Sequence, residues 1–526
     1  MPVALAAAVA LLNASLSFQN VWPTPAIHWT GELSIELPVF LLLLVIAARR
    51  MGPPSRVAIR WLAALWVLLT AAHYADVTAP ALYGRDINLY WDLRHIPDVA
   101  AMVVRAAPLW LVVLVVTAAA LSVVLLYLLF GWAMVRVADA IRAPRHRFGI
   151  AVFATLVVLL FAGQRLSGGF PPVPRFSTPV TLTYARQIRV VADAMGGSTM
   201  VAASPPMDED LALVRGADVF LVFVESYGSI AYERPDIAPV LATRRASLAA
   251  TIEATGQHIV SAYVESPTFG GSSWLAHVSL MSGVEVRTPE INARLMTQKR
   301  ETMVTAFARH GYRTVALMPG LRQRWPEGSF YGFDEIYGAE QLKYRGPEFG
   351  WFALPDQFSL ARLDALEASH TSRQPIFVFF PTISTHFPFS PTPPYQPDWP
   401  RMLSSRPYDG AAVVDAYSRE PDWTHFSPGY VDAVSYAYST LEGYLRAHAN
   451  RDVVMVVLGD HQPPSAVSGE GASWDVPVHV IARRKPILDR LLEHGFLAGI
   501  TPARPALGRM NTLQPILLEA FSEKRE

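Results

Sequence analysis

The chain has 526 residues, of which 52% are hydrophobic and only 17% are charged, and its mean hydropathy is +0.25. It is too apolar for an ordinary soluble protein, and a net charge of zero argues against a nucleic-acid-binding surface. The sequence has no cysteine, which excludes disulfides, cysteine-ligated zinc and thiol catalysis.

Long apolar runs fill the first third of the chain. About 20 apolar residues are needed to cross the hydrocarbon layer of a membrane, so these runs predict five membrane spans. The first run lacks the basic start of a signal peptide and is therefore interpreted as an anchor. The predicted spans are residues 2–21, 34–48, 57–75, 108–134 and 148–166, which make residues 1–166 a multi-span α-helical membrane domain.

The arginines between these spans predict the orientation of the chain. The segments 49–60 and 136–147 each carry four arginines, whereas residues 22–33 contain neither lysine nor arginine. Basic loops stay on the cytoplasmic side of a membrane. We therefore expect a cytoplasmic N-terminus and residues 168–526 on the outer side.

Residues 167–210 are predicted to form a linker. Its start, "SGGFPPVPRFSTPVTL", is rich in glycine, proline and serine, and residues 184–195 have the periodicity of an amphipathic helix that lies along the membrane surface.

Apolar strand-like runs alternate with amphipathic helical stretches over residues 211–526. Such an alternation predicts a mostly parallel sheet sandwiched by helices, whose ligands bind beyond the carboxyl ends of the strands. The predicted strands are 218–226, 258–266, 314–320, 375–384, 452–460 and 476–483, and the clearest predicted helices are 237–255, 301–311 and 428–447.

Residues able to bind a metal follow several of these strands. Glu225 ends the first strand, the adjacent pair Asp460 and His461 ends the run "VVLGD", and His386 follows the strand at 375–384. Carboxylates and imidazole at one edge of a sheet suit a divalent ion such as Mn²⁺, Mg²⁺ or Zn²⁺. Singly, each of these residues is equally compatible with an ordinary loop position.

The stretch "GGSSWLAHVSLMSG" (270–283) places two serines at the predicted start of a helix. Serine is a common N-cap, because its hydroxyl accepts a hydrogen bond from a free N–H group of the first turn. The same N–H groups also attract anions, and a serine beside them and beside a metal ion is a candidate nucleophile.

The motifs "VFVESYG", "GGSSWLAHVSLMSG", "STHFPF" and "VVLGDHQPP", in this order after the apolar spans, resemble the membrane-anchored sulfatase-like phosphotransferases of the alkaline phosphatase superfamily. The nearest likenesses are to lipoteichoic acid synthases and to phosphoglycerol transferases of periplasmic glucans, and lipid A phosphoethanolamine transferases are more distant. The resemblance implies a sulfatase-like α/β domain for residues 211–526.

The same resemblance implies roles for individual residues. The family's nucleophile lies about ten residues before the glycine that ends its helix, which corresponds to Ser273, with Ser272 as the alternative. Metal ligands correspond to Glu225, Asp460 and His461, with Ser273 as the fourth. The family's substrate-binding residues correspond to His386 and, by a looser match, to Arg324.

The chain departs from the family at three places. Serine replaces the threonine that is usual at the nucleophile, and Tyr438 stands in "YAY" where the family shows an aspartate. True sulfatases require proline and arginine two and four residues after the nucleophile, where this chain has Leu275 and His277. Sulfate-ester hydrolysis by that route is therefore not expected. His277 is interpreted as a helix-packing residue, with an anion ligand in place of the missing arginine as the alternative.

The resemblance implies a metal-dependent transferase, in the bacterial inner membrane, with its catalytic domain on the periplasmic side. It would move phosphoglycerol or phosphoethanolamine from a membrane phospholipid to an envelope glycan or lipid through a phosphoserine. A membrane-tethered phosphodiesterase with the same site, and a catalytically inactive glycan-binding module, are the alternatives. The sequence does not identify the headgroup, the acceptor or the metal.

Overall fold

The computed structural model describes residues 2–97, 100–101, 104, 107–167, 174–196, 200–323, 325–368 and 373–523. The chain divides into two compact units, Met1–Gly197 and Ser198–Glu526.

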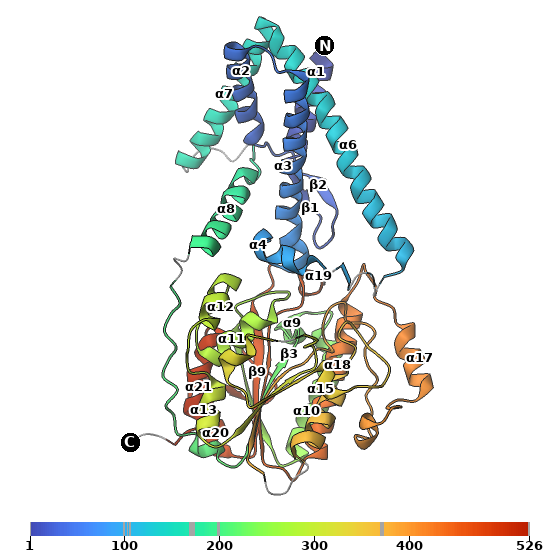
Figure 1. Cartoon of the computed structure of the whole chain (residues 1–526), viewed down its shortest axis with the longest axis vertical. Coiled ribbons are helices and arrows are strands. Elements are labelled where there is room, and N and C mark those ends of the chain that lie inside the picture. Colours follow the sequence, from blue (N-terminus) through green and yellow to red (C-terminus); the bar gives the residue numbers. More distant parts are fainter. Residues whose placement is uncertain are drawn as a thin grey trace. The chain divides into compact units, whose positions relative to one another are not determined.

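The first unit is mainly helical (Figure 1), and a helix lies in each of the five segments predicted to span the membrane. Among the residues that the structure describes, three helices are long and apolar enough to cross a bilayer: α3, α6 and α7 up to Leu166. At 1.5 Å per residue, α1 and α2 extend only about 20 and 24 Å, less than the hydrocarbon thickness of about 30 Å. The five-span count therefore stays a prediction. The elements are α1 Pro2–Ala14, β1 Phe18–Asn20, β2 Ile27–Trp29, α2 Glu36–Met51, α3 Arg56–Tyr83, α4 Leu89–Asp92, α6 Leu109–Arg142, α7 Pro144–Ser167 and α8 Val180–Gly196.

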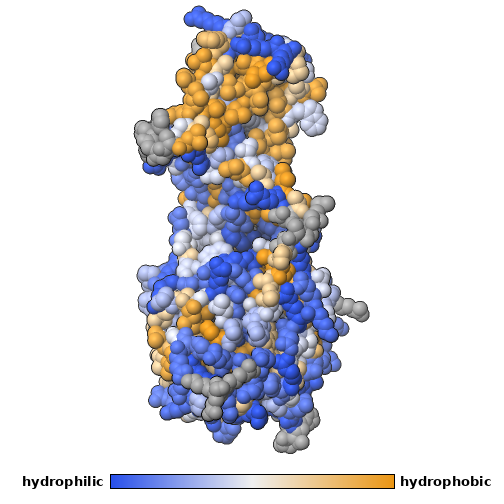
Figure 2. Space-filling view, turned by 90° about the vertical axis from the view of Figure 1, so that its left-hand side faces the viewer, coloured by the Kyte–Doolittle hydropathy of each residue, from blue (hydrophilic) through white to orange (hydrophobic). Residues whose placement is uncertain are grey.

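Helices α1, α2, α3 and α6 share an apolar core around Trp66 and Phe130, both fully buried. Their outward-facing side chains are also apolar, as the hydrophobic surface of this unit in Figure 2 shows. A surface of this kind is stable against lipid rather than water. The chain before α2 also pairs with the chain after α7, through a bridge between Leu33 and Phe176.

The second unit is built on an eight-stranded sheet with the order β10-β4-β9-β8-β3-β7-β5-β6. The five strands from β8 to β6 are parallel, and β9 is antiparallel to both β8 and β4, so β4 runs in the same direction as the central strands. The predicted mostly parallel sheet is confirmed. The strands are β3 Asp218–Val224, β4 His258–Glu265, β5 Arg313–Met318, β6 Glu335–Gly338, β7 Ile376–Pro381, β8 Val453–Gly459, β9 Asp475–Ala482 and β10 Leu497–Ala498.

Helices cover both faces of this sheet (Figure 1), because alternate residues of each buried strand point in opposite directions. Leu221 and Phe223 of β3 belong to the core formed with α11, α13, α20 and α21, whereas Phe220 and Val222 belong to the core formed with α10, α16 and α18. The helices are α9 Ile230–Glu233, α10 Ala238–Ala254, α11 Ser273–Ser282, α12 Pro289–Met296, α13 Met303–Arg309, α14 Gly328–Tyr331, α15 Ala339–Leu342, α16 Asp356–Leu363, α17 Gly410–Ser418, α18 Ser427–Ala447, α19 Ser465–Ser468, α20 Lys485–Glu493 and α21 Leu513–Ala520.

The strand register aligns the residues that follow the three central strands. Val224 of β3 pairs with Gly459 of β8, and Phe223 of β3 pairs with Pro381 of β7. The next residue on β3 is Glu225 and the next on β8 is Asp460, so the two carboxylates leave the sheet side by side.

Candidate active site

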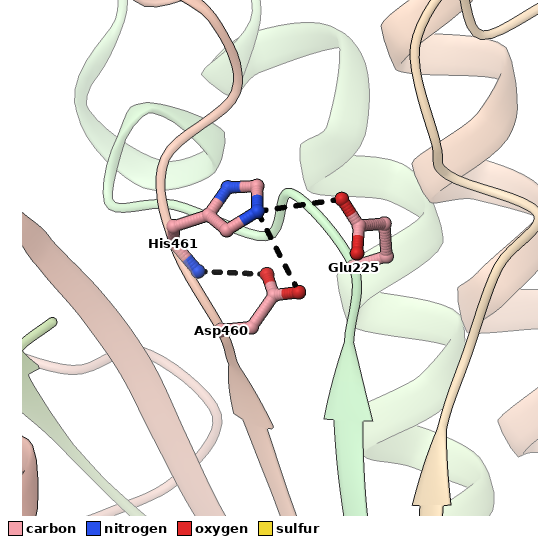
Figure 3. A group of neighbouring side chains, drawn as sticks. All are labelled: Glu225, Asp460 and His461. Carbon is pink, nitrogen blue, oxygen red and sulfur yellow. Dashed lines mark hydrogen bonds and ion pairs between the residues drawn. The ribbon is translucent and has the colours of Figure 1, made fainter. Parts of the chain in front are cut away.

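Glu225, Asp460 and His461 form a compact buried group at the carboxyl edge of the sheet (Figure 3). One potential ligand atom from each residue lies within 4.8 Å of the others. Nε2 of His461 is 3.4 Å from Oε1 of Glu225 and 3.7 Å from Oδ2 of Asp460. The structure thus brings together the three residues that the sequence analysis proposed as metal ligands.

Backbone and hydroxyl groups fix the orientation of this group. Oδ1 of Asp460 accepts hydrogen bonds from the backbone N–H groups of Ser226, at 2.8 Å, and His461, at 2.7 Å. Nδ1 of His461 lies 2.7 Å from the carbonyl oxygen of Gln462. A carbonyl only accepts, so Nδ1 carries the proton, and in the neutral imidazole the lone pair on Nε2 faces the carboxylates.

The electrostatics of the group are those of a cation site. Burial favours the neutral form of Glu225, but His461 and His386, in their protonated forms, outweigh it and lower the pKa of this carboxyl to about 2. Burial and the negative charge of Glu225 raise the pKa of Asp460 well above its usual value. Two buried carboxyl groups thus compete for one negative charge, and a divalent ion would stabilise both as carboxylates.

The backbone before α11 determines which serine faces this group. Gly270 (φ 65°), Gly271 (φ 146°) and Ser272 (φ 63°) all have positive φ values, and α11 begins directly after them at Ser273. The hydroxyl of Ser273 donates to Oε2 of Glu225 at 2.8 Å and lies 3.1 Å from Nε2 of His461. The side chain of Ser272 makes no capping hydrogen bond.

These contacts distinguish the two interpretations of the serine pair. Ser272 occupies the N-cap position without acting as a cap through its hydroxyl, and Ser273 directs its hydroxyl to the acidic group. The Ser273 oxygen would complete a donor set of two carboxylates, one imidazole and one hydroxyl, which fits a divalent cation in both charge and ligand type. The assignment of Ser273 as nucleophile and fourth ligand stays a prediction.

The two expected substrate-binding residues differ in what the structure describes. His386 follows β7, its ring lies 5.0 Å from that of Phe352, and its charge acts on Glu225. Nδ1 of His386 is 2.7 Å from the carbonyl oxygen of Phe387, which directs Nε2 away from that carbonyl. Arg324 lies outside the described residues.

Three residues that hold the site were not singled out from the sequence. Ser226 donates its hydroxyl to Oε1 of Glu225 at 3.1 Å, and Thr382 accepts from the backbone N–H of Glu225 at 3.1 Å. Asp356 accepts from the backbone N–H groups of Ile383 and Ser384, at 2.8 and 3.0 Å, and so anchors the loop that leads to His386. Only Ser226 had a sequence signal, its position directly after Glu225.

His277 and Tyr438 occupy the positions where the sequence departs from the family. His277 is buried against Phe223 and Phe379, with ring centroids 4.6 and 5.3 Å away, and burial lowers its pKa to about 3. These contacts are those expected of a helix-packing residue. The hydroxyl of Tyr438 lies 2.9 Å from that of Tyr227, in a buried polar cluster.

Comparison with known sequences identifies one matching family. The sequence model of the Sulfatase family matches residues 276–477, a range that contains His386, Asp460 and His461 and begins just after Ser273. No curated protein sequence matches the chain.

Three solved structures illustrate the similarity in fold. The lipooligosaccharide phosphoethanolamine transferase EptA of Neisseria meningitidis is 15% identical, covers 91% of this chain and 88% of its own, and gives a TM-score of 0.45. The lipoteichoic acid synthase LtaP of Listeria monocytogenes is 15% identical, with coverages of 56% and 71% and a TM-score of 0.36. The phosphoglycerol transferase GacH of Streptococcus pyogenes is 13% identical, with coverages of 57% and 74% and a TM-score of 0.32.

The Sulfatase match thus includes two residues, Asp460 and His461, of the buried group that they form with Glu225. Residues 276–477 of the chain therefore match the Sulfatase family, in agreement with the resemblance seen in its sequence motifs.

Proposed function

We propose that this protein is a metal-dependent phosphotransferase that takes phosphoglycerol or phosphoethanolamine from a membrane phospholipid. An envelope glycan or lipid is the acceptor, and the catalytic unit lies on the periplasmic side of the inner membrane. The observation that carries the proposal is the hydroxyl of Ser273, which lies 2.8 Å from Glu225 and 3.1 Å from His461 at the first turn of α11.

The metal site supports the proposal through the chemistry of its donors. Glu225, Asp460, His461 and the Ser273 oxygen would hold one Mn²⁺, Mg²⁺ or Zn²⁺ ion. Such an ion favours the ionised serine hydroxyl and neutralises charge on a phosphoryl oxygen.

The residues of the chain have separate roles in the first half of the reaction. Oγ of Ser273, whose proton is already directed at Oε2 of Glu225, attacks phosphorus. The Oγ–P bond forms as the bond from phosphorus to the diacylglycerol oxygen breaks, and the proton that Ser273 loses passes by way of Glu225 to that oxygen, which leaves as a hydroxyl. The free N–H groups at the start of α11, a helix of ten residues, face the phosphoryl oxygens.

The second half regenerates the serine. An acceptor hydroxyl attacks phosphorus, the Oγ–P bond breaks, and the acceptor's proton returns to Ser273. His386 is assigned to the transferred headgroup or the leaving oxygen. Apolar helices long enough to span a membrane would keep this chemistry close to its lipid donor, which raises the effective concentration of the donor.

Intact-protein mass spectrometry of the full chain, after incubation with phosphatidylglycerol or phosphatidylethanolamine, tests the proposal. We expect a headgroup-phosphate adduct on the wild type and on Ser272→Ala, and none on Ser273→Ala. An adduct on Ser273→Ala but not on Ser272→Ala would move the nucleophile by one residue, and no adduct on any form would refute the covalent mechanism. Release of the labelled headgroup into water, unaffected by added glycan or lipid acceptors, would identify a hydrolase instead.

A further inference from the structure

The first unit, called the membrane unit below, contains a cavity of about 440 Å³. The start of α2, the end of α7 and the start of α8 surround this cavity. This volume lies within the range of about 300–1,000 Å³ that is usual for small-ligand sites. Most of its lining is apolar and comes from Ile35, Val39, Phe161, Pro179 and Leu182.

The walls of this cavity are held together by backbone hydrogen bonds. The N–H of Leu33 donates to the carbonyl of Arg175 at 2.9 Å, and the N–H of Ser177 donates to the carbonyl of Leu33 at 3.0 Å. These bonds join the chain that enters α2 to the chain that enters α8. The cavity is therefore a built feature of the unit.

A buried carboxylate forms one polar wall. Glu36 is only 8% exposed and lines the cavity. It accepts hydrogen bonds from the hydroxyl of Ser34, at 2.7 Å, and from the N–H and hydroxyl of Thr181, at 3.2 and 3.4 Å. A carboxylate has about four acceptor positions, so these three bonds leave capacity for one further donor.

A guanidinium forms a second polar part of the lining. Arg165 lies near the end of α7, with its guanidinium carbon 5.4 Å from the centroid of the Phe161 ring. The described hydrogen bonds of Glu36 go to hydroxyl and amide groups and not to Arg165. The cavity thus presents a buried, hydrogen-bonded carboxylate and an exposed guanidinium beside Phe161 to whatever enters it.

The surroundings of the cavity indicate a lipid. Val39 and Leu182 line it and are 41% and 59% exposed, and Figure 2, which views this side of the unit, shows a largely hydrophobic surface. The arginine distribution of the sequence predicts that the start of α2 and the end of α7 lie on the outer side of the membrane. The two charged groups then lie at the level of the outer headgroups.

We propose that this cavity binds a phospholipid whose headgroup carries a primary ammonium. The ammonium donates to the remaining acceptor position of Glu36, the phosphate pairs with Arg165, and the glycerol and upper acyl carbons pack on the apolar wall. An anionic headgroup without an amine lacks the group that Glu36 recognises, and a quaternary amine has no N–H to donate. This site goes beyond the proposed function, because it lies in the other unit and needs no reaction at Ser273.

Native mass spectrometry of the detergent-purified full chain, carrying Ser273→Ala to prevent turnover, tests the proposal. Phosphatidylethanolamine, phosphatidylcholine and phosphatidylglycerol with identical acyl chains are titrated separately. Glu36→Gln should weaken binding of phosphatidylethanolamine about tenfold, the usual value of a charged hydrogen bond, and leave phosphatidylglycerol unchanged. Arg165→Gln should weaken the binding of both phosphatidylethanolamine and phosphatidylglycerol.

Matched controls use nearby residues that do not line the cavity. Glu32→Gln removes a carboxylate that accepts from Gln19, and Arg175→Gln removes an exposed guanidinium. Both should bind all three lipids within about twofold of the parent. Equal binding of the three lipids by the parent, or equal effects of Glu36→Gln and Glu32→Gln, would overturn the proposal.

A second measurement keeps the test decisive if Glu36→Gln does not fold. A photoactivatable phosphatidylethanolamine should label peptides that contain residues 35–39, 161–165 or 179–182, and Leu182→Trp should block this labelling by filling the cavity from its exposed side. Labelling confined to residues 198–526 would overturn the site while leaving the proposed catalytic function standing.

Discussion

Acidification should destabilise the catalytic unit through His479, a buried residue of β9 that supports the loop after Glu225. Its Nδ1 lies 2.7 Å from the hydroxyl of Ser261, which donates its own proton to the carbonyl of Gly499 at 2.6 Å. Nδ1 therefore carries the imidazole proton. Nε2 lies 3.2 and 3.1 Å from the hydroxyls of Tyr227 and Tyr232, which are also hydrogen-bonded to each other, and accepts a hydrogen bond from this pair.

The size of the effect follows from the pKa of this histidine. Burial, with a smaller contribution from the charge of Arg245, lowers the pKa of His479 to about 3, whereas an unfolded chain protonates it near 6.5. Between these values the unfolded state binds one more proton than the folded state. The free energy of unfolding should therefore fall as pH falls, by about 1.4 kcal/mol between pH 7.5 and 5.5 for this group.

Hydrogen exchange of peptides from β9 and β4, measured at both pH values and corrected for intrinsic exchange, reports this change. In His479→Asn the side-chain amide still donates to Ser261 but does not titrate. The fall in the free energy of unfolding between pH 7.5 and 5.5 should therefore be about 1.4 kcal/mol smaller in this variant than in the wild type. His258→Asn, at the exposed start of β4, is the control and should keep the wild-type pH dependence. If His479→Asn and the wild type lose the same stability on acidification, the reasoning about this histidine is wrong.

Three further predictions concern the metal, the packing behind it and the membrane topology. Asp460→Ala should lose the bound divalent ion, measured by elemental analysis, and full metal content in this variant would contradict the ligand assignment. Gly228→Ala places a Cβ 1.6 Å from Oε1 and 2.9 Å from Cα of Gln462, and should lower stability by about 1–3 kcal/mol in thermal unfolding. Gly410→Ala, with no atom within 4 Å of the added Cβ, should be close to neutral. Reporter fusions after residues 140 and 200 should report opposite sides of the membrane, and the same side for both would contradict the predicted orientation.

The buried group of Glu225, Asp460 and His461 could be predicted from the sequence, because its residues directly follow the ends of strands. Glu225 and Asp460 each follow a run of buried apolar residues, and parallel strands end at one edge of a sheet whatever their order. The order itself is not encoded in local patterns, so the sequence did not reveal that β7 borders β3. Thr382 and Asp356 act on the site through that neighbour relation, which explains why they were missed.

The short strands at the two edges of the sheet could not be predicted from the sequence either. β6 and β10 have four and two residues, too few for a hydrophobic period to stand out, and they form through pairing with longer strands. In the membrane unit the apolar runs located α1 and α2 correctly. Apolarity alone did not predict how soon these helices end, after 13 and 16 residues.

Backbone conformation, more than side-chain preference, determines which of the two serines faces Glu225. A capping serine has an extended backbone, and Ser272 instead adopts φ 63° and ψ 40°, which costs a residue with a Cβ about 1–2 kcal/mol. Glycine would avoid that cost, and the two preceding glycines take the other positive φ values. An extended Ser272 would start the helix in another direction and turn Ser273 away from Glu225. The strain at Ser272 and the 2.8 Å contact of Ser273 are thus two consequences of one turn, and they support the assignment of Ser273, rather than Ser272, as the reacting hydroxyl.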